Sequence, residues 1–334
     1  MATQEPASKL APFRIDPKFD VRVWGWQDLR PWFDRVAEQG EPLGEVWLTG
    51  DMCTVATGPN AGKRLDALFA EAHEGQGVNT LLGPVAPSAE SPLLIKVLFA
   101  REKLSVQVHP DDKMAQKYGN PRGKTECWYA LAAEPEAKVA VGLRPGVTLD
   151  QVKDEIRAGT LESSLNTLRV AAGDVIFVDA GTVHAIWPGS VLLETQQNCD
   201  LTYRMYDYGR PRELHIEKSL EATKLVTRAG KVAPRELADR TILVDADYFR
   251  VERMQVAGSR FSHSLRSEDT PAPGLAYLFA AAGAGRIVGQ EFAPVDLPPR
   301  GIVAVPASSP HFVVEDLGLP EASLDLIRIT PKWP

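Results

Sequence analysis

The sequence predicts a mainly β fold in two domains of barrel or sandwich type, and three observations lead to this prediction. First, 26 glycines and 26 prolines are spread along the chain and separate many short apolar runs. Second, those runs have the composition of strands. Third, a chain of 334 residues exceeds the roughly 150 of a typical domain, so two domains or one large elaborated domain are expected. The clearest predicted strands are Leu93–Ala100, Val175–Val178, Val191–Thr195, Tyr277–Ala281 and Ile302–Val305.

A weak internal similarity supports two domains. Residues 173–184 and residues 301–311 each run from a glycine through a β-branched stretch and a turn of small residues to a histidine, which is His184 in the first and His311 in the second. We place the boundary in the polar segment near residues 226–236. The predicted domains are therefore residues 1–228 and residues 229–334.

Helical patterns are fewer, and three segments carry them. Residues 27–39 place their apolar side chains on one face of a helix. Thr148 can cap a helix that runs to Arg157 and ends at Gly159, with Gln151 at the spacing of a capping box. A third helix, Glu213–Val226, is expected to link the two halves of the chain.

Composition excludes several classes of protein. The net charge of -7, without any basic run, gives no electrostatic footprint for nucleic acid. Cys53, Cys127 and Cys199 lie far apart, which fits neither a disulfide framework nor a zinc-thiolate site and suits a reducing compartment. Residues 1–6 lack the features of a secretory signal, and no apolar run approaches the roughly 18 residues that span a bilayer. We therefore expect a cytoplasmic protein with no nucleic-acid or membrane partner.

The segment Leu104-Ser-Val-Gln-Val-His-Pro-Asp-Asp112 carries an unusual polar face. Successive side chains of a strand alternate between its two faces, so Ser105, Gln107 and His109 share one face, opposite the apolar residues between them. A lone histidine is more often structural than functional. A serine, a glutamine and a histidine together on one face are nevertheless unusual for a strand that is buried on its other side.

Two further residues extend this set. Glu126 lies in a polar segment that enters an apolar strand, and His184 ends the first of the two similar repeats. With Gln107 and His109 they form a group of two imidazoles, a carboxylate and an amide. That mixture of nitrogen and oxygen donors suits Zn²⁺ or another borderline divalent ion, with a coordination position left for water or substrate.

At this point the sequence resembles a known family. Four ordered motifs are similar to those of type I mannose-6-phosphate isomerase in its short bacterial form, a member of the cupin superfamily. The resemblance runs from about residue 20 to the C-terminus. The motifs are Gln107-Val-His109-Pro-Asp-Asp, Gly123-Lys-Thr-Glu126-Cys-Trp-Tyr, Asp179-Ala-Gly-Thr-Val-His184-Ala and Tyr203-Arg204-Met-Tyr-Asp-Tyr-Gly-Arg210.

The resemblance implies a fold, an activity and a cofactor. The fold would be two cupin-like (jelly-roll) β-barrel domains with a few packing helices, the N-terminal one catalytic and the C-terminal one metal-free. The activity would be an aldose–ketose isomerisation that interconverts mannose 6-phosphate and fructose 6-phosphate through an enediolate. One Zn²⁺ per chain would be held by Gln107, His109, Glu126 and His184. The chain would act as a monomer or a homodimer.

Further roles follow from positions that match the family. The reaction moves a proton between C1 and C2, so it needs a base and a positive group near the developing oxyanion. Glu194, Arg204 and Lys124 match family positions that line the active site. We expect Glu194 to transfer the proton, with Lys124 as the rival, and Arg204 to stabilise the enediolate. Ser105 and Arg210 match positions tied to phosphate binding.

Plainer interpretations stay open at this stage. Glu194 could form a structural ion pair with an arginine, Arg210 could be a solvated turn residue, and Ser105 could satisfy a backbone group. The chain could also be a cupin oxygenase that uses Fe²⁺, since a fold does not fix its chemistry, or a regulator that binds a sugar phosphate without turnover. The number of phosphosugar-type residues, Lys124 and Arg210 among them, disfavours the oxygenase.

Overall fold

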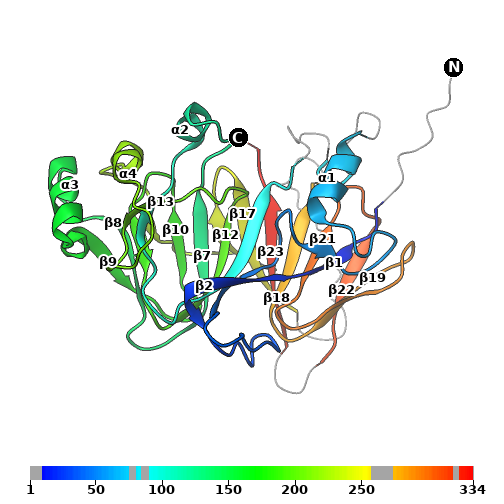
Figure 1. Cartoon of the computed structure of the whole chain (residues 1–334). Helices are drawn as coiled ribbons and strands as arrows, with labels where there is room; N and C mark the ends of the chain where they lie inside the picture. Colours follow the sequence, from blue (N-terminus) through cyan, green and yellow to red (C-terminus); the bar gives the residue numbers. More distant parts are fainter. Residues whose placement is uncertain (1–9, 75–79, 84–89, 257–273, 319–322, 334) are drawn as a thin grey trace. The chain divides into compact units, whose positions relative to one another are not determined.

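The computed structural model describes residues 10–74, 80–83, 90–256, 274–318 and 323–333, which form a mainly β protein of several antiparallel sheets (Figure 1). These residues fall into two compact units. Unit 1 comprises the described residues of Met1–Lys18, Leu48–Pro92 and Pro234–Pro334, and unit 2 comprises Phe19–Trp47 and Leu93–Ala233. The predicted mainly β fold class is confirmed.

The two units do not correspond to a division of the chain at a single point. The junction at Ala233 and Pro234 lies close to the predicted boundary at residues 228/229, but two N-terminal segments group with the C-terminal one. The reason is strand pairing over long sequence distances. Strand β1 (Phe13–Asp16) pairs with β21 (Ile302–Val305) on one side and with β4 (Thr54–Val55) on the other.

Unit 2 contains two sheets, and it is the unit that carries the predicted site. The larger sheet has seven strands in the order β14, β10, β7, β12, β5, β3 and β2, and the smaller has five in the order β13, β6, β11, β8 and β9. Their bounds are β2 (Lys18–Trp26), β3 (Leu43–Trp47), β5 (Leu93–Phe99), β6 (Val106–Val108), β7 (Glu126–Ala133), β8 (Lys138–Leu143), β9 (Leu165–Arg169), β10 (Val175–Val178), β11 (His184–Ile186), β12 (Ser190–Gln197), β13 (Tyr203–Tyr206) and β14 (Gly230–Lys231).

The alternation of side chains divides the apolar residues of unit 2 into two clusters. One cluster lies between the sheets and takes Trp128 and Leu192 from the larger sheet and Ile186 from the smaller. The other covers the outer face of the smaller sheet, where Val106 and Val108 pack with residues of the helices. Because Gln107 lies between these two valines on β6, its side chain points to the opposite face, toward the larger sheet.

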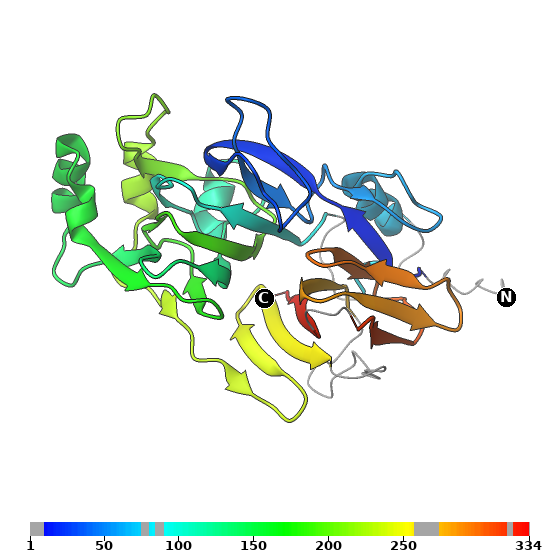
Figure 2. The same cartoon turned by 90° about the horizontal axis from the view of Figure 1, so that it is seen from below.

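Unit 1 is also made of two sheets. Its eight-stranded sheet has the order β15, β16, β17, β23, β18, β21, β1 and β4, and its three-stranded sheet has the order β20, β19 and β22. The antiparallel pair of β16 and β17 is the yellow pair of arrows in Figure 2. The remaining bounds are β15 (Arg235–Glu236), β16 (Thr241–Asp245), β17 (Phe249–Val256), β18 (Ala276–Ala282), β19 (Gly285–Gly289), β20 (Val295–Leu297), β22 (Phe312–Asp316) and β23 (Leu324–Pro331).

All five predicted strands are confirmed. Val175–Val178 and Ile302–Val305 match β10 and β21 at both ends, and the other three match β5, β12 and β18 within one or two residues. Frequent glycines and prolines thus marked the ends of strands well, because these residues interrupt regular pairing.

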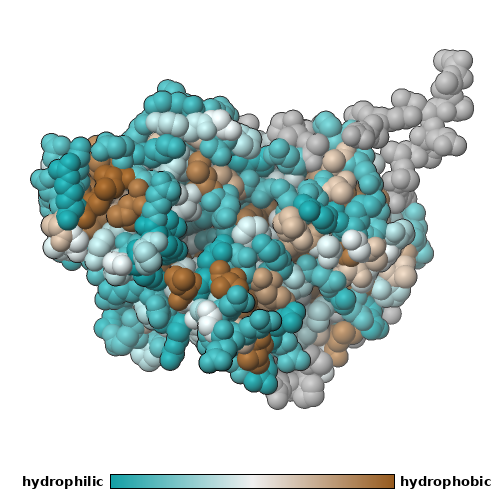
Figure 3. Space-filling view, viewed as in Figure 1, coloured by the Kyte–Doolittle hydropathy of each residue, from teal (hydrophilic) through white to brown (hydrophobic). Residues whose placement is uncertain are grey.

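Of the three predicted helices, two exist in the structure and one does not. Helix α3 (Leu149–Ala158) is confirmed with both of its caps: the Thr148 side chain accepts a hydrogen bond from the Gln151 N–H, and Gly159 ends the helix at φ 73°. The third predicted helix exists as the shorter α4 (Ile216–Ala222). Figure 1 shows α3 and α4 beside the smaller sheet of unit 2, and Figure 3 shows hydrophobic side chains partly exposed in this region.

The prediction of a helix at Gln27–Gln39 is wrong. The segment forms turns and an isolated bridge between Asp28 and Val36. Pro31 lacks an N–H and disfavours a helical conformation at Arg30, and the Arg30 N–H donates to the Asp28 carboxylate instead. Two helices, α1 (Leu65–Glu74) and α2 (Asp112–Lys117), were not predicted.

No helix within the described ranges is both long enough and apolar enough to cross a membrane. The prediction that residues 1–6 carry no secretory signal concerns residues outside the described ranges.

Candidate metal centre

The four predicted metal ligands come from the two sheets of unit 2. Gln107 lies on β6 and His184 begins β11, and these two residues are directly opposite each other in the smaller sheet. His109 directly follows β6, and Glu126 begins β7 in the larger sheet. The site is therefore a meeting point of side chains between two sheets, built from segments that lie far apart in the sequence.

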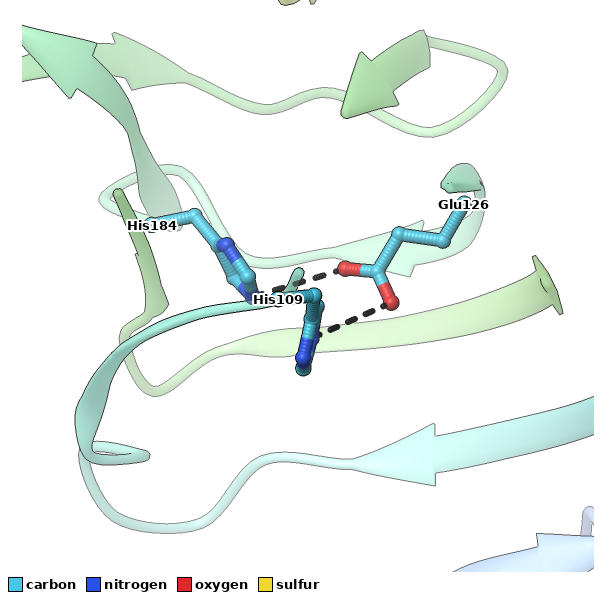
Figure 4. Close-up of side chains that lie close together, drawn as sticks. All are labelled: His109, Glu126 and His184. Carbon is cyan, nitrogen blue, oxygen red and sulfur yellow. Dashed lines mark ion pairs between the residues drawn. The ribbon is translucent and has the colours of Figure 1, made fainter. Parts of the chain in front are cut away.

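Three of these side chains converge closely. The Nε2 atom of His109 lies 3.6 Å from Oε2 of Glu126, and the Nε2 atom of His184 lies 3.5 Å from Oε1 of the same carboxylate. The ligand atoms of the three residues all lie within 4.8 Å of one another. Figure 4 shows both imidazole rings turned toward the carboxylate. The arrangement presents two nitrogens and a carboxylate to one point.

The other nitrogen of each imidazole is held by the backbone. Nδ1 of His109 is 2.9 Å from the carbonyl oxygen of Leu201, and Nδ1 of His184 is 2.9 Å from that of Thr182. A carbonyl accepts only, so each Nδ1 carries the proton and each neutral Nε2 keeps its lone pair. Metal-binding histidines are commonly oriented in this way.

Burial keeps both imidazoles neutral. His109 and His184 are each 1% exposed. Desolvation, followed by the charge of Lys124 and by the second imidazole, lowers the pKa of His109 well below its usual value. Desolvation is also the main cause that lowers the pKa of His184 to about 4. Neutral imidazole is the form that binds a metal ion.

Gln107 completes the group from the smaller sheet. Its amide nitrogen lies 3.2 Å from Nε2 of His184, and its amide oxygen accepts a hydrogen bond of 3.3 Å from the Ser105 hydroxyl. A half-turn of the amide plane exchanges the two atoms and presents the carbonyl oxygen to the same point as the imidazole nitrogens. The hydrogen bond confirms that Ser105 and Gln107 share one face of the strand.

The carboxylate of Glu126 is the strongest sign that a cation fits here. Its side chain is fully buried, and within the described residues its Oε1 accepts no hydrogen bond. The ammonium of Lys124 lies 2.8 Å from Oε2 and 3.2 Å from Nε2 of His109. A buried carboxylate oxygen without a partner is costly. The donor set of two imidazoles, one carboxylate and one amide fits a divalent cation such as Zn²⁺.

Glu194 and Lys124 lie next to this group. Glu194 is buried on β12, accepts a hydrogen bond of 3.0 Å from Nε1 of Trp128, and has its Oε1 3.8 Å from the ammonium of Lys124. Desolvation raises the pKa of Glu194, and the lysines oppose this increase. Burial alone would lower the pKa of Lys124, but the carboxylates of Glu126 and Glu194 outweigh it and raise that pKa.

Lys96 is a buried cation of this region that the sequence analysis missed. Its ammonium lies 3.8 Å from Oε1 of Glu194, 3.4 Å from Glu45 and 3.3 Å from Asp200. In the part of the chain that the structure describes, the ion-pair partners of Glu194 are therefore the two lysines Lys96 and Lys124, and no arginine pairs with it as the structural interpretation had expected. The sequence could have indicated this buried cation, because Lys96 lies inside the otherwise apolar run Leu93–Phe99, which is fully buried.

Arg204 lies on the same face as the metal ligands. It is opposite Gln107 in the pairing of β13 with β6, and directly opposite residues project from the same face of a sheet. Its Nη1 donates to the carbonyl oxygen of Glu213 at 3.0 Å, and its backbone N–H donates to Nδ1 of His215 at 3.2 Å. Its Nε is buried and has no hydrogen-bond partner among the described residues.

The two residues predicted to bind phosphate lie in neighbouring segments. Ser105 is buried and donates the hydrogen bond to Gln107 that is described above. Arg210 lies in the turn after β13, where its guanidinium contacts the Asp207 carboxylate and the carbonyl oxygen of Lys103. His311, the histidine of the second repeat, belongs to unit 1 and is exposed. A metal-free second domain remains a prediction.

Comparisons with known proteins agree on one family. The family model "Phosphomannose isomerase type I, catalytic domain" matches residues 13–146. A probable mannose-6-phosphate isomerase of Bacillus subtilis, GmuF, is 34% identical over 295 residues, which are 83% of this chain and 88% of the relative. The mannose-6-phosphate isomerase of Streptococcus mutans is 35% identical over 84% of this chain and 88% of its own length.

A solved structure extends the similarity to the whole fold. The crystal structure of a mannose 6-phosphate isomerase from Bacillus subtilis superposes with a TM-score of 0.80 at 28% identity, over 96% of this chain and 99% of that one. A phosphomannose isomerase from Salmonella typhimurium gives a TM-score of 0.75 at 17% identity, which shows a shared fold. The similarity therefore includes both units.

Proposed function

The chain belongs to the type I mannose-6-phosphate isomerase family, and we propose that it interconverts mannose 6-phosphate and fructose 6-phosphate by proton transfer between C1 and C2 through an enediolate. The observation that carries the proposal is the buried group of His109, Glu126 and His184 between the sheets of unit 2, with Lys124 and Glu194 beside it. An isomerisation of this kind needs a base, a positive group and a means of orienting the sugar oxygens.

The cofactor we propose is one Zn²⁺ per chain, held by Gln107, His109, Glu126 and His184. The neutral imidazoles and the unpaired Oε1 of Glu126 support it. A bound divalent cation supplies electrostatic stabilisation of oxygen atoms of the sugar. The supporting hydrogen bonds from Nδ1 of both histidines fix the direction of the rings, so little reorganisation is needed on binding.

Glu194 is our candidate for the proton transfer. A general base works best when its pKa lies near the working pH, and burial moves the pKa of Glu194 upward from that of an ordinary glutamate. The hydrogen bond from Trp128 fixes one carboxylate oxygen and leaves Oε1 facing Lys124. Lys124 remains the rival, although the neighbouring carboxylates raise its pKa and so favour its protonated form.

Arg204 is our candidate for stabilising the enediolate. Its guanidinium lies on the face of the smaller sheet that carries Gln107, and its buried Nε has no partner among the described residues. A positive group already in place at a site of developing negative charge needs no reorganisation during the reaction. Ser105 and Arg210 would bind the phosphate, since a hydroxyl and a guanidinium both donate hydrogen bonds to phosphate oxygens.

The proposed cellular location is the cytoplasm. The three cysteines are free thiols, which suits a reducing compartment. A phosphorylated sugar substrate is charged and does not cross a membrane unaided, so an enzyme that acts on it works where the sugar phosphate is made.

One experiment tests the function. The purified protein is assayed for conversion of mannose 6-phosphate to fructose 6-phosphate, before and after removal of metal with a chelator and again after addition of Zn²⁺. We expect turnover that is lost with the metal and restored by it, and no comparable turnover of unphosphorylated mannose. Turnover unaffected by complete metal removal would contradict the cofactor, and oxygen uptake with Fe²⁺ in place of isomerisation would contradict the function.

A further inference from the structure

The turn that follows β13 organises several charges around one buried carboxylate. Asp207 is 2% exposed, and the N–H of Arg210 donates to its carbonyl oxygen at 3.0 Å. The two residues between them have positive φ, 55° at Tyr208 and 80° at Gly209. Such a conformation is unfavourable for a tyrosine and persists where the surroundings hold it, which is common at binding sites.

Two guanidinium groups share the Asp207 carboxylate. Arg212 approaches side-on, with Nε 2.6 Å from Oδ2 and Nη2 2.8 Å from Oδ1. Nη2 of Arg210 lies 2.8 Å from the same Oδ1. A two-point contact between an arginine and a carboxylate fixes the plane of the guanidinium as well as its position. Asp207 therefore sets the direction of two arginine side chains at once.

Arg210 is held from two further sides. Its Nη2 donates to the carbonyl oxygen of Lys103 at 2.6 Å, and its guanidinium lies 5.6 Å from the ring centroid of Tyr208. The two arginines are still open to a ligand, because their side chains are 19% and 27% exposed. Within the described residues, no hydrogen bond involves Nη1 of either arginine, so donors remain on both.

Positive charge exceeds negative charge in this region. Desolvation, followed by the charge of Arg212, lowers the pKa of Arg204, and Arg210 acts in the same direction. Two carboxylates act on the pKa of Arg204 in the opposite direction, the buried Asp207 and the largely exposed Glu213. Lys103, whose carbonyl oxygen accepts from Arg210, has its ammonium paired with Glu162 at 2.8 Å. An anion is therefore favoured beside these arginines, and a phosphate monoester brings a charge between about -1.5 and -2.

We propose that Asp207 is a positioning residue that holds Arg210 and Arg212 as a preset pair for the phosphate of the sugar phosphate, and that Arg212 is a second phosphate-binding guanidinium. The proposal rests on the proposed function, because it places the phosphate beside Arg204, which lies opposite Gln107. The proposed reaction gives Arg212 no other role. A pair fixed before binding loses less side-chain freedom when the phosphate arrives.

The test compares three variants of the full chain loaded with zinc. Asp207→Asn removes the shared charge, and Arg212→Gln removes the second guanidinium but leaves Asp207 with Arg210. Arg169→Gln is the control, because it removes an exposed guanidinium of the same unit that pairs with Glu136 at 3.3 Å. Each variant is measured for kcat and KM with mannose 6-phosphate, for the inhibition constant of inorganic phosphate, and for zinc content.

Loss of one charge-assisted contact predicts a change of about ten- to 100-fold. We expect KM and the inhibition constant of phosphate to rise together by this factor in Asp207→Asn and Arg212→Gln, with kcat within about threefold, full zinc content and an unchanged control. A fall in kcat with an unchanged phosphate constant would overturn the proposal, and so would equal weakening of phosphate by Arg169→Gln.

Failure of the proposed function would look different. If the unaltered protein does not turn over mannose 6-phosphate, binding of inorganic phosphate by calorimetry still separates Arg212→Gln from Arg169→Gln. Equal affinity in these two variants would then overturn the phosphate pair by itself. If Asp207→Asn fails to fold, Arg212→Gln carries the test, because its side chain lies partly at the surface.

Discussion

Two regions with similar sequences, residues 173–184 and residues 301–311, end in histidines with different surroundings. In each, a strand of the larger sheet of its unit, β10 or β21, is followed by a turn and then by a strand of the smaller sheet, β11 or β22. His184 is buried opposite Gln107, whereas His311 is exposed. The same strand-turn-strand pattern therefore supports a candidate metal ligand in one unit and a surface residue in the other.

The strands that face each other explain the difference. In unit 2 the space between the sheets receives Glu126 and Lys124 as well as apolar side chains. In unit 1 the corresponding cluster takes Leu278 and Val303 from the larger sheet and Ile287 from the smaller. Both units thus have apolar side chains between their sheets, and unit 2 also has the polar group of Glu126 and Lys124 there. The comparison teaches that a histidine in this strand-turn-strand pattern can serve as a metal ligand only where other donor side chains lie beside it.

Buried charges sharpen the contrast. Unit 1 also contains a buried carboxylate, Glu252, but Nε of Arg328 donates to its Oε2 at 2.7 Å and Nε of Arg240 donates to its Oε1 at 2.9 Å. Both oxygens are therefore satisfied. In unit 2 the Oε1 of Glu126 accepts no hydrogen bond from the described residues. A buried ion pair is a complete structural unit, while an unsatisfied buried carboxylate oxygen calls for a ligand.

The largest expected difference between the two repeats concerns the metal. His184→Ala should lose bound zinc and isomerase activity by more than the roughly 100-fold that removal of an outer partner of a metal ligand costs. His311→Ala should retain both. The measurements are metal analysis of the purified variants and turnover of mannose 6-phosphate. Full activity and full metal content in His184→Ala would refute the ligand assignment and remove the functional distinction between the repeats.

A second comparison concerns arginines on the smaller sheets. Arg204→Ala should lower kcat by about 100-fold or more, as loss of a donor to a developing oxyanion does, because Arg204 lies opposite Gln107 on the face of the smaller sheet where we propose the reaction takes place. Arg286→Ala in β19 removes an exposed guanidinium that pairs with Asp296 at 2.6 Å, and it should leave kcat unchanged. Thermal melting of both variants is the companion measurement. If Arg204→Ala changes only the melting temperature, Arg204 has a structural role.

A third comparison tests the apolar interior of unit 1. Ile287→Ala should reduce the free energy of unfolding by about 2–5 kcal/mol, because it removes a fully buried side chain from between the sheets and leaves a cavity. Val288→Ala, on the other face of the same strand and only half-buried, should cost less. Denaturant titration measures both. An equal loss in the two variants would mean that the inner face of β19 is not the stabilising one.

Sequence patterns located the candidate ligands because the information was local. The alternation of side chains around Gln107 and His109 needs only the period of a strand, and the structure has both side chains on the inner face. The capping residue Thr148 was found for the same reason. Glu126 and His184 needed the ordered motifs of the family as well, since nothing local indicates that strands so far apart in the sequence will meet.

What the sequence did not predict depends on contacts between distant segments. The pairing of Ile15 with Ile302, which joins the start of the chain to its end within unit 1, leaves no local trace. The same holds for Lys96, whose partners Glu45 and Asp200 lie about 50 and 100 residues away. The helix predicted at Gln27–Gln39 failed for the opposite reason: its apolar spacing was helical, but Pro31 and the Asp28 side chain favour turns.

The smallest expected effect concerns the helices that cover the smaller sheet of unit 2. Val152 and Ile156 of α3 belong to the apolar cluster on the outer face of that sheet, so fraying of α3 would loosen the strand layer that carries Gln107. Thr148→Ala removes the acceptor of the Gln151 N–H and should lower the free energy of unfolding by about 1 kcal/mol.

The matched control for this cap is Thr160→Ala. Thr160 precedes the short 3-10 helix Leu161–Ser164, but its side chain makes no capping hydrogen bond. Both substitutions remove the same atoms from an exposed helix start, so the difference between their unfolding free energies isolates the contribution of the hydrogen bond. Denaturant titration measures the unfolding free energy of both variants, and we expect the zinc content of both to be unchanged. An equal loss of stability would show that the cap of α3 contributes through the propensity of threonine and not through its hydroxyl group.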